Sequence, residues 1–459
     1  MIIPAVAGVL FALESPSDQS RKPALLVSGL VFVLSLVLWA GFDSSYTGYQ
    51  FVSGRFGIDG ISLWFILLTT FTIPVCILAQ WNTPTSPFPL FLLLEAALIG
   101  LFASLDLVLF YVFFEAVLIP LFLIVAVWGA SADRIRAAYL LFLYTLFGSL
   151  FMLLAFLHII SMTGTSDLRL LAASDIGFSV QRILWIGIFI SFAVKTPLVP
   201  VHIWLPRAHA EAPVGGSMIL AGLILKLASY GFLRILLPIL PEASYYFAPA
   251  VQTIALISLV YASFATIRQT DIKALVAYSS ICHVAVVVAG TFSNSLAGIE
   301  GAMLLSLAHG LISPGLFFLC GGVLYDRFHT RVIRYYSGLT SHMPIAMALF
   351  LVLILANAGT PLTLNWLGEF LSLAGTALTF PIIAALMATS VLFSACYSMW
   401  LFVRIAYGRP SEAVVRPLDL NRREFVVLAS LIVPALVLGI IPGPVLSTLH
   451  PAVTLLLGA

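Results

Sequence analysis

Apolar runs of close to 20 residues, separated by short polar loops, dominate this sequence. An α-helix needs about 20 mostly apolar residues to cross the hydrocarbon core of a bilayer. Only 9% of the residues are charged and 61% are hydrophobic, whereas soluble domains contain about 25% charged residues. These charges are too few to cover a water-exposed surface. The sequence therefore predicts an all-α membrane protein whose outer surface faces lipid, and its net charge of +2 argues against a nucleic-acid partner.

The apolar runs predict about fourteen transmembrane helices. The first is short but lacks the basic start of a cleavable signal peptide. Prolines break helices, so Pro197 and Pro200 are expected to interrupt the seventh span and Pro361 the twelfth. The expected spans are 1–14, 23–42, 60–80, 88–104, 106–129, 136–162, 180–205, 214–237, 246–266, 271–291, 296–325, 343–378, 382–407 and 424–447.

Lysine and arginine are distributed unevenly between the two sets of loops. Most of the 21 such residues fall in loops after odd-numbered spans, Arg416 among them. Positively charged loops mark the cytoplasmic or matrix side of a membrane. The loops after odd-numbered spans are therefore expected on that side, and both termini on the opposite side. The loops after even-numbered spans hold only Arg55, Arg169, Arg182 and Arg234.

Two sequence matches indicate an internal repeat. The Thr-Pro-Leu sequence at 196–198 recurs at 360–362, and Asp106 at the start of the fifth span is matched by Asp271 at the start of the tenth. A unit of five helices ends on the opposite side of the membrane from its start, because five is an odd number. The second copy is therefore expected to be inverted in the membrane, as in many transporters. The expected domains are 1–85 with helices 1–3, 86–240 with the first repeat (helices 4–8), 241–410 with the second (helices 9–13), and 411–459 with helix 14.

Ionisable residues inside the predicted spans are the main indication of function, because a charge at mid-bilayer costs about 3 kcal/mol. They are Glu95, Glu115, Lys195, Lys226 and Glu369. A buried lysine beside a carboxylate can change its charge state near neutral pH, whereas arginine stays protonated. Both mid-membrane cations are lysines, so the pattern predicts a proton relay.

Structural interpretations remain open for some of these residues. A salt bridge between Glu115 and Lys195 would simply hold two helices together, and Glu95 equally fits a hydrogen bond between packed helices. Lys226 lies too deep in its span for its ammonium group to reach the interface. The relay is therefore the main hypothesis for the lysines and Glu115, with Glu95 in an auxiliary role.

Histidine titrates near neutral pH and suits proton transfer. His309, shortly before Pro314 in a long span, is expected to be a central relay group. His202, His209 and His283 are auxiliary candidates, with structural hydrogen bonding as the alternative. No two histidines show a facing arrangement that would hold a haem. The four cysteines are scattered without metal-ligand spacing, which argues against an iron–sulfur or zinc site. No cofactor or metal is expected in this chain.

Five segments carry a family resemblance, and the longest is KTPLVPVHIWLPRAHAEAPVGGSMILAGLILKLASYGFLR at 195–234. The others are FYVFFEAVLIPLF, DIKALVAYSSICHV, LAHGLISPGLFFLCGGVLYDR and GTPLTLNWLGEFL. From about residue 55 onward the chain thus resembles the antiporter-like membrane subunits of respiratory complex I.

The resemblance implies a fourteen-helix core with two inverted five-helix repeats, and proton translocation driven by quinone reduction in partner subunits. Glu115 and Lys195 match the family's Glu–Lys pair, and Lys226 matches its connecting lysine. His309 matches the histidine of the broken eleventh helix. Glu369 matches the acidic group of the twelfth helix, where sister subunits carry lysine.

The leading hypothesis is a proton-translocating subunit of NADH:ubiquinone reductase, whose own chain holds no redox centre. Its partners would be other membrane-arm subunits, including neighbouring antiporter-like subunits, and membrane lipids. The alternatives are a subunit of a multisubunit Na⁺/H⁺ antiporter and a passive membrane scaffold. The mitochondrial inner membrane is the expected location, and a bacterial plasma membrane is the alternative.

Overall fold

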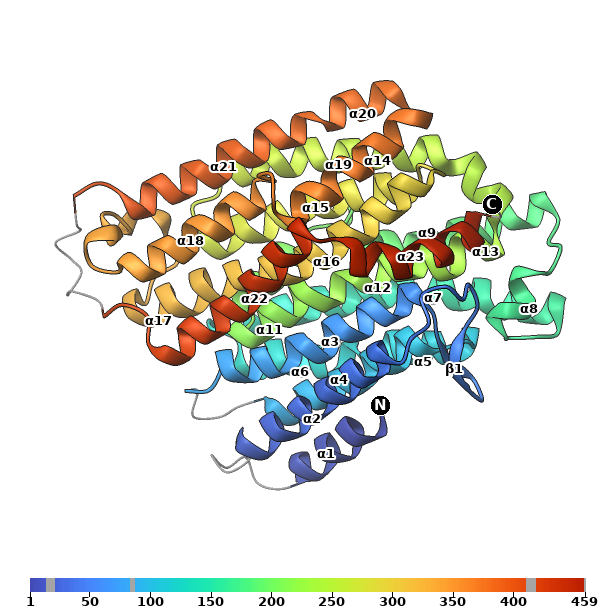
Figure 1. Cartoon of the computed structure of the whole chain (residues 1–459), viewed down its shortest axis with the longest axis horizontal. Helices are drawn as coiled ribbons and strands as arrows, with labels where there is room; N and C mark the ends of the chain where they lie inside the picture. The colour runs from blue at the N-terminus through green and yellow to red at the C-terminus, as the bar shows by residue number, and fades with distance from the viewer. Residues whose placement is uncertain (14–20, 83–86, 410–417, 458–459) are drawn as a thin grey trace.

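The computed structural model describes residues 1–13, 21–82, 87–409 and 418–457. Arg416 and the predicted domain boundary at residue 411 lie outside these residues. Most helices run along one common direction, so the chain forms an elongated bundle (Figure 1). A β-hairpin of β1 (Gln50–Ser53) and β2 (Phe56–Ile58) departs from the all-α prediction. Gly54 makes its turn possible, because its φ of 60° suits glycine best.

Within the described residues, 11 helices are long and apolar enough to cross a membrane. The chain is therefore a multi-pass helical membrane protein. These spans are α2 (Arg21–Ala40), α3 (Gly60–Ala79), α5 with α6 (Leu107–Ala116, Leu118–Trp128), α7 (Arg134–Thr163), α9 (Phe178–Lys195), α11 to α13 (Val214–Ile239), α14 (Pro241–Ile267), α15 (Ile272–Thr291), α16 to α17 (Leu296–Phe328), α20 with α21 (Pro381–Met387, Thr389–Ala406) and α22 (Arg422–Ile440).

The remaining helices are shorter. Four of them are apolar: α1 (Ile2–Leu13), α4 (Phe88–Ala103), α18 (Pro344–Asn357) and α23 (Gly443–Leu457). The others are α8 (Leu168–Ala172), α10 (Trp204–Glu211), α19 (Leu364–Thr379), η5 (Ile333–Tyr335) and η6 (Leu339–Ser341).

The observed helices agree closely with the first, fourth and twelfth predicted spans. The first and fourth form α1 and α4, which are shorter than a full crossing. The span 343–378 consists of α18 and α19 with a non-helical segment at Pro361 between them, as the proline predicts. The predicted last span ends early, because Pro442 and Pro444 interrupt the chain after Ile440, and α23 follows as an unpredicted helix.

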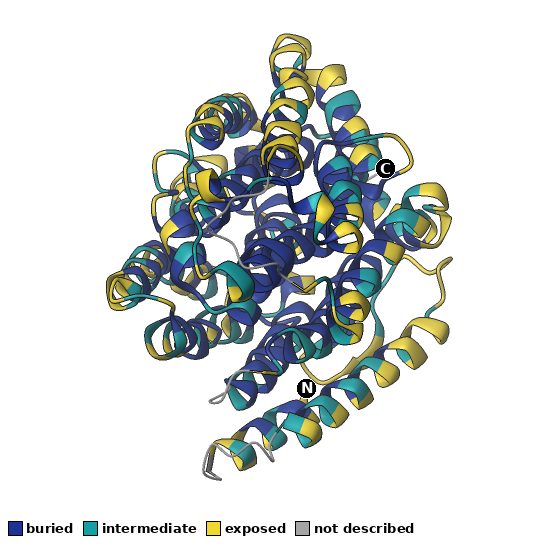
Figure 2. Cartoon of the chain, turned by 90° about the vertical axis from the view of Figure 1, so that its left-hand side faces the viewer, coloured by how far each residue is buried: buried dark blue, intermediate teal, exposed yellow. Residues whose placement is uncertain are grey.

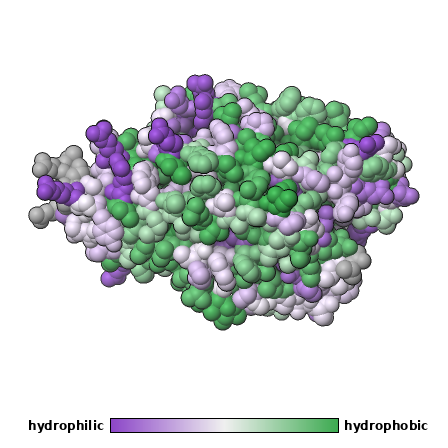
Figure 3. Space-filling view, turned by 90° about the horizontal axis from the view of Figure 1, so that it is seen from above, coloured by the Kyte–Doolittle hydropathy of each residue, from purple (hydrophilic) through white to green (hydrophobic). Residues whose placement is uncertain are grey.

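Burial separates a central layer from a lipid-facing rim (Figure 2). The spans Val214–Ile239 and Leu296–Phe328 lie at the centre and are buried nearly throughout. Outer helices expose apolar side chains instead, such as Leu26 and Val33 on α2 and Val437 on α22. Hydrophobic side chains cover much of the middle of the molecule, and many of the most hydrophilic ones lie towards its two ends (Figure 3). This surface suits a bilayer.

Asp106 and Asp271 are N-caps in two connections with the same hydrogen-bond pattern. The Asp106 carboxylate accepts bonds from the N–H groups of Val108 and Leu109, and Asp271 accepts from those of Lys273 and Ala274. Each aspartate also forms an isolated β-bridge, with Asp167 and Val332 respectively. The backbone hydrogen bonds correspond as well. In the first connection, the Leu107 N–H donates to Ser166 O and the Leu168 N–H to Leu105 O. In the second, the Ile272 N–H donates to Arg331 O and the Ile333 N–H to Thr270 O.

Two helices end at the positions where the sequence repeats Thr-Pro-Leu. α9 ends at Lys195, and a non-helical segment leads to α10. α18 ends at Asn357, and another non-helical segment leads to α19. Because proline supplies no N–H, these breaks leave backbone carbonyls free to accept hydrogen bonds from buried side chains.

π-helical turns widen the two central spans. They are η2 (Leu220–Ile224) and η3 (Phe232–Leu236), which lie between α11 (Val214–Ile219), α12 (Leu225–Gly231) and α13 (Leu237–Ile239), and η4 (Leu319–Leu324), which joins α16 (Leu296–Phe318) to α17 (Tyr325–Phe328). Such turns are frequent at functional sites because they disturb the regular hydrogen bonds of a helix.

Candidate functional site

Lys226 and His309 form the centre of the buried polar site. The Lys226 Nζ lies 2.7 Å from the His309 Nδ1, and both side chains are almost completely buried. The same Nζ donates to the Ala221 carbonyl at 2.7 Å, inside the π-helical turn η2. The local helix distortion thus supplies a second partner for the lysine.

Close packing of two helices brings this pair together. A Cβ added at Gly310 would lie 3.2 Å from the Gly222 carbonyl oxygen and 2.6 Å from a Leu68 methyl carbon. α16 therefore approaches η2 at a distance that only glycine permits. Larger residues at these positions would separate His309 from Lys226.

His283 and Glu369 form a second buried pair. The His283 Nδ1 lies 2.7 Å from the Glu369 Oε1, and the other ring nitrogen, Nε2, lies 3.2 Å from the Asn357 Oδ1. Asn357 donates its amide N–H to the Ser398 hydroxyl, so its oxygen faces the ring. With the amide in this orientation, the His283 Nε2 donates to Asn357 and the Nδ1 faces the Glu369 carboxylate.

The two pairs lie side by side. The ring centroids of His283 and His309 are 5.8 Å apart. The His309 Nε2 is buried and has no hydrogen-bond partner among the described residues. The structure thus brings four of the predicted residues, Lys226, His309, His283 and Glu369, into one continuous polar cluster drawn from four helices.

Glu115 and Lys195 lie apart from this cluster. Lys195 is buried at the end of α9, and its Nζ donates to the Phe114 carbonyl at 3.4 Å and lies 4.0 Å from the centroid of the Phe114 ring. Glu115, one residue further on, is half-buried, with Ser149 beside its carboxylate. The charges of Glu115 and Lys195 interact, but the hydrogen bond of the lysine goes to the backbone.

The auxiliary candidates occupy different environments. His209 on α10 is fully buried, stacks on Phe317 with 4.3 Å between ring centroids, and lies within electrostatic range of Lys226 and Lys273. His202 packs against the Tyr261 ring, away from the central cluster. Glu95 is buried on α4, which packs between α1 and α3.

Sequence reasoning missed three polar residues of this region. Asn357 and Ser398 were hidden because single amides and hydroxyls are common in membrane helices, where they usually only pack. Lys273 was read as a loop cation, but it is buried and its Nζ donates to the Ala212 carbonyl at 2.8 Å. The available signal was its position as the third residue of the predicted span 271–291.

The cluster does not resemble a metal site. Among the described residues, no three His, Cys, Asp or Glu side chains are grouped closely enough to hold a metal ion. Its members instead form two hydrogen-bonded pairs of titratable side chains, Lys226 with His309 and His283 with Glu369.

A model of the protein family described as NADH:quinone oxidoreductase/Mrp antiporter matches residues 104–394, which include the whole cluster. The chain belongs to this family.

Members of the NADH:quinone oxidoreductase/Mrp antiporter family include close relatives of the whole chain. NADH-ubiquinone oxidoreductase chain 4 of Mycosarcoma maydis is 54% identical over 468 residues, covering 98% of this chain and 97% of that protein. A chain of respiratory complex I from Thermus thermophilus with bound NADH superposes with a TM-score of 0.91 at 33% identity, covering 100% of this chain and 98% of that one.

A more distant protein has the same fold. A chain of the Mrp complex from Dietzia sp. DQ12-45-1b superposes with a TM-score of 0.89, covering 99% of this chain and 96% of that one, at only 18% identity. This likeness establishes a shared fold and carries no statement about function.

Proposed function

We propose that this chain is a proton-translocating membrane subunit of respiratory complex I, and that it couples NADH:ubiquinone oxidoreduction in partner subunits to proton transfer. The observation that supports this most directly is the cluster of Lys226, His309, His283 and Glu369, which lies between two broken helices. The relatives named above support the assignment to complex I.

In this proposal the proton moves along the cluster in steps that its hydrogen bonds define. Lys226 shares a proton with the His309 Nδ1. Once Glu369 has taken the proton that it shares with the His283 Nδ1 and has released it, that nitrogen is vacant and receives the proton from the neighbouring His309. Because the His283 Nε2 is committed to Asn357, His283 exchanges its other proton with Glu369. Glu369 is the release group.

Glu115 and Lys195 act as the coupling element in the same proposal. Lys195 can turn from the Phe114 carbonyl to the Glu115 carboxylate, because both acceptors belong to adjacent residues of α5. A short distance between the Lys195 ammonium and the Glu115 carboxylate keeps the lysine charged, and a longer distance favours release of its proton. A change of charge in a neighbouring subunit would shift this balance.

We further propose a fourteen-helix core with two inverted repeats, over 86–240 and 241–410, flanked by 1–85 and 411–459. The connections capped by Asp106 and Asp271 support this, because each of the two backbone hydrogen bonds in the first connection recurs in the second between residues 165 positions later. α8 lies at one end of the bundle and α17 at the other (Figure 1), as inversion requires. In the same scheme the mitochondrial inner membrane is the location.

Replacing His309 in the assembled complex tests the proposal. His309→Phe removes the central link while keeping a ring of similar size. NADH:ubiquinone activity and proton pumping are measured in proteoliposomes, after native electrophoresis has established that the complex assembles. We expect normal assembly with pumping reduced by about tenfold, equivalent to 1.4 kcal/mol at the transition state.

His158→Phe is the matched control, because His158 lies on the exposed side of α7. It should assemble and pump normally. Full pumping by the His309→Phe complex would contradict the relay and favour a passive scaffold. Sodium-dependent pumping by the unmodified complex would favour the Na⁺/H⁺ antiporter alternative.

A further inference from the structure

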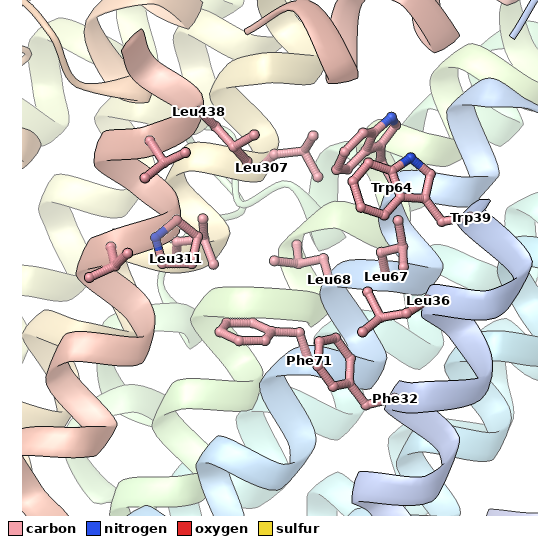
Figure 4. Close-up of a pocket in the computed structure, with 13 residues that line it drawn as sticks. Phe32, Leu36, Trp39, Trp64, Leu67, Leu68, Phe71, Leu307, Leu311 and Leu438 are labelled. Carbon is pink, nitrogen blue, oxygen red and sulfur yellow. The ribbon is translucent and has the colours of Figure 1, made fainter. Parts of the chain in front are cut away.

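A cavity of about 420 Å³ opens in the lipid-facing wall of the bundle. Its walls come from four helices: α2, α3, α16 and α22 (Figure 4). Leu36 and Val437 line it and are exposed, whereas Leu307 and Leu311 line it and are buried. The cavity thus runs from the surface of the protein to its interior.

Water does not suit this cavity. All its lining residues are apolar or aromatic. The indole N–H of Trp64 already donates to the Thr448 hydroxyl at 2.7 Å. A buried water needs two to four polar partners, so an apolar occupant fits the lining.

A transmembrane helix of a partner subunit is too large for this space. A helix has a diameter of about 10 Å with its side chains, and one of 20 residues is about 30 Å long, so it could lie across the mouth of the cavity but not enter it. The cavity holds about 420 Å³. A single flexible hydrocarbon chain, in contrast, is narrow enough to enter.

A pair of aromatic residues marks each end of the cavity. Trp39 and Trp64 meet there with 5.6 Å between ring centroids, and Phe32 and Phe71 meet at the other end with 5.7 Å (Figure 4). Trp39 is next to the last residue of α2, whereas Phe32 is in its middle. Tryptophan is enriched at membrane–water interfaces, so the tryptophan end lies near the headgroups and the phenylalanine end deeper.

We propose that this cavity binds one acyl chain of a phospholipid, with the headgroup near Trp39 and Trp64. The inner wall of the cavity adjoins the proton relay. Leu307 and Leu311 flank His309 on α16, and Leu68 packs against Gly310. The bound chain would complete the packing behind the helix segment that carries His309. The binding itself does not depend on the proposed relay.

Photocrosslinking of the intact complex tests this site. The probe is phosphatidylcholine with a diazirine at the middle of one acyl chain, incorporated into membranes that hold the assembled complex. We expect crosslinks on peptides containing Phe32 or Leu311. Leu36→Trp and Val437→Trp, which fill the mouth from opposite walls, should each lower the yield by about tenfold, as for a loss of 1.4 kcal/mol in binding.

Leu143→Trp on α7 is the control, because Leu143 is equally apolar and exposed but lies outside the cavity. It should leave the yield unchanged. Equal crosslinking in the mouth variants and the unmodified complex would overturn the proposal.

A density map of the unmodified complex provides a second measurement that needs no variant. Thin, unbranched density between Trp39 and Leu311 is expected. Density of helical width in the cavity, or crosslinking of a partner polypeptide in place of lipid, would refute the acyl-chain assignment.

Discussion

The ammonium nitrogen of Lys226 lies 2.7 Å from a ring nitrogen of His309, although 83 positions separate the two residues. In this contact one proton is shared whichever residue donates it, because a lysine and a histidine nitrogen can each give or accept a proton. In the proposed relay, this pair would store a proton without an adjacent carboxylate, and the further transfer steps would depend on it.

Lys226→Met is expected to reduce proton pumping by about tenfold, or 1.4 kcal/mol at the transition state. The methionine fills a similar volume but cannot share a proton with His309. Lys226→Arg should also fail to restore pumping, because arginine remains protonated. Proteoliposome pumping assays on assembled complexes measure both effects. Lys22→Met, at an exposed position on α2, should behave as the unmodified complex does.

Glu369→Gln is expected to leave assembly intact and to reduce pumping by about tenfold, equivalent to 1.4 kcal/mol. The glutamine amide can still hydrogen-bond the His283 Nδ1, but it cannot bind and release a proton. Glu242→Gln, at an exposed position at the start of α14, is the control. If Glu369→Gln pumped at the normal rate, proton release through Glu369 would be ruled out.

Asn357→Leu is expected to reduce pumping and to alter its pH profile. The change leaves the buried His283 Nε2 without its partner, at a cost of about 1–3 kcal/mol, and the ring then no longer has a fixed protonated nitrogen. Pumping rates measured across pH distinguish this effect from a purely structural one, which would lower the rate equally at every pH.

Asn365→Leu provides the matched control for Asn357→Leu. Asn365 is also buried, and it lies on α19, where its amide oxygen has no hydrogen-bond partner among the described residues. Its replacement should leave the pH profile unchanged. The same altered profile in both variants would contradict the role of Asn357.

Asp106→Ala and Asp271→Ala are expected to destabilise the protein by similar amounts, about 1 kcal/mol each, because each removes a helix cap in an equivalent connection. Thermal denaturation of the assembled complex, followed by loss of this chain from the native band, measures both. Asp175→Ala, at an exposed loop position, should have little effect. Clearly unequal effects of the two cap variants would count against the repeat.

The sequence indicated which ionisable residues are buried better than it indicated which side chains they contact. Lys226 and Glu369 stood out because charges are costly within apolar runs. Which groups meet depended on long-range packing: Gly222 against Gly310 brings Lys226 to His309, and nothing in the local sequence records that approach.

Helix ends were predictable where a proline or an aspartate marks them. The start of α15 after Asp271 agrees with the prediction. α23 was missed because the apolar run continues through Pro442 and Pro444, so hydropathy alone gave one longer span. Lys195 was predicted to pair with Glu115, yet in the structure its hydrogen bond goes to the Phe114 carbonyl, since a helix end offers a nearby acceptor that a charge pattern does not reveal.

The matching connections at Asp106 and Asp271 bear on how a proton acquires a direction. A backbone built from two oppositely oriented copies does not by itself favour either direction of proton movement across the membrane, because turning it over reproduces the same backbone. Vectorial transport must then come from side chains that one copy has and the other lacks. Ser280 occupies the position 165 residues after Glu115, and a hydroxyl there cannot hold the charge that a carboxylate holds. In the proposed repeat, this is one chemical difference that would give the two halves unequal roles.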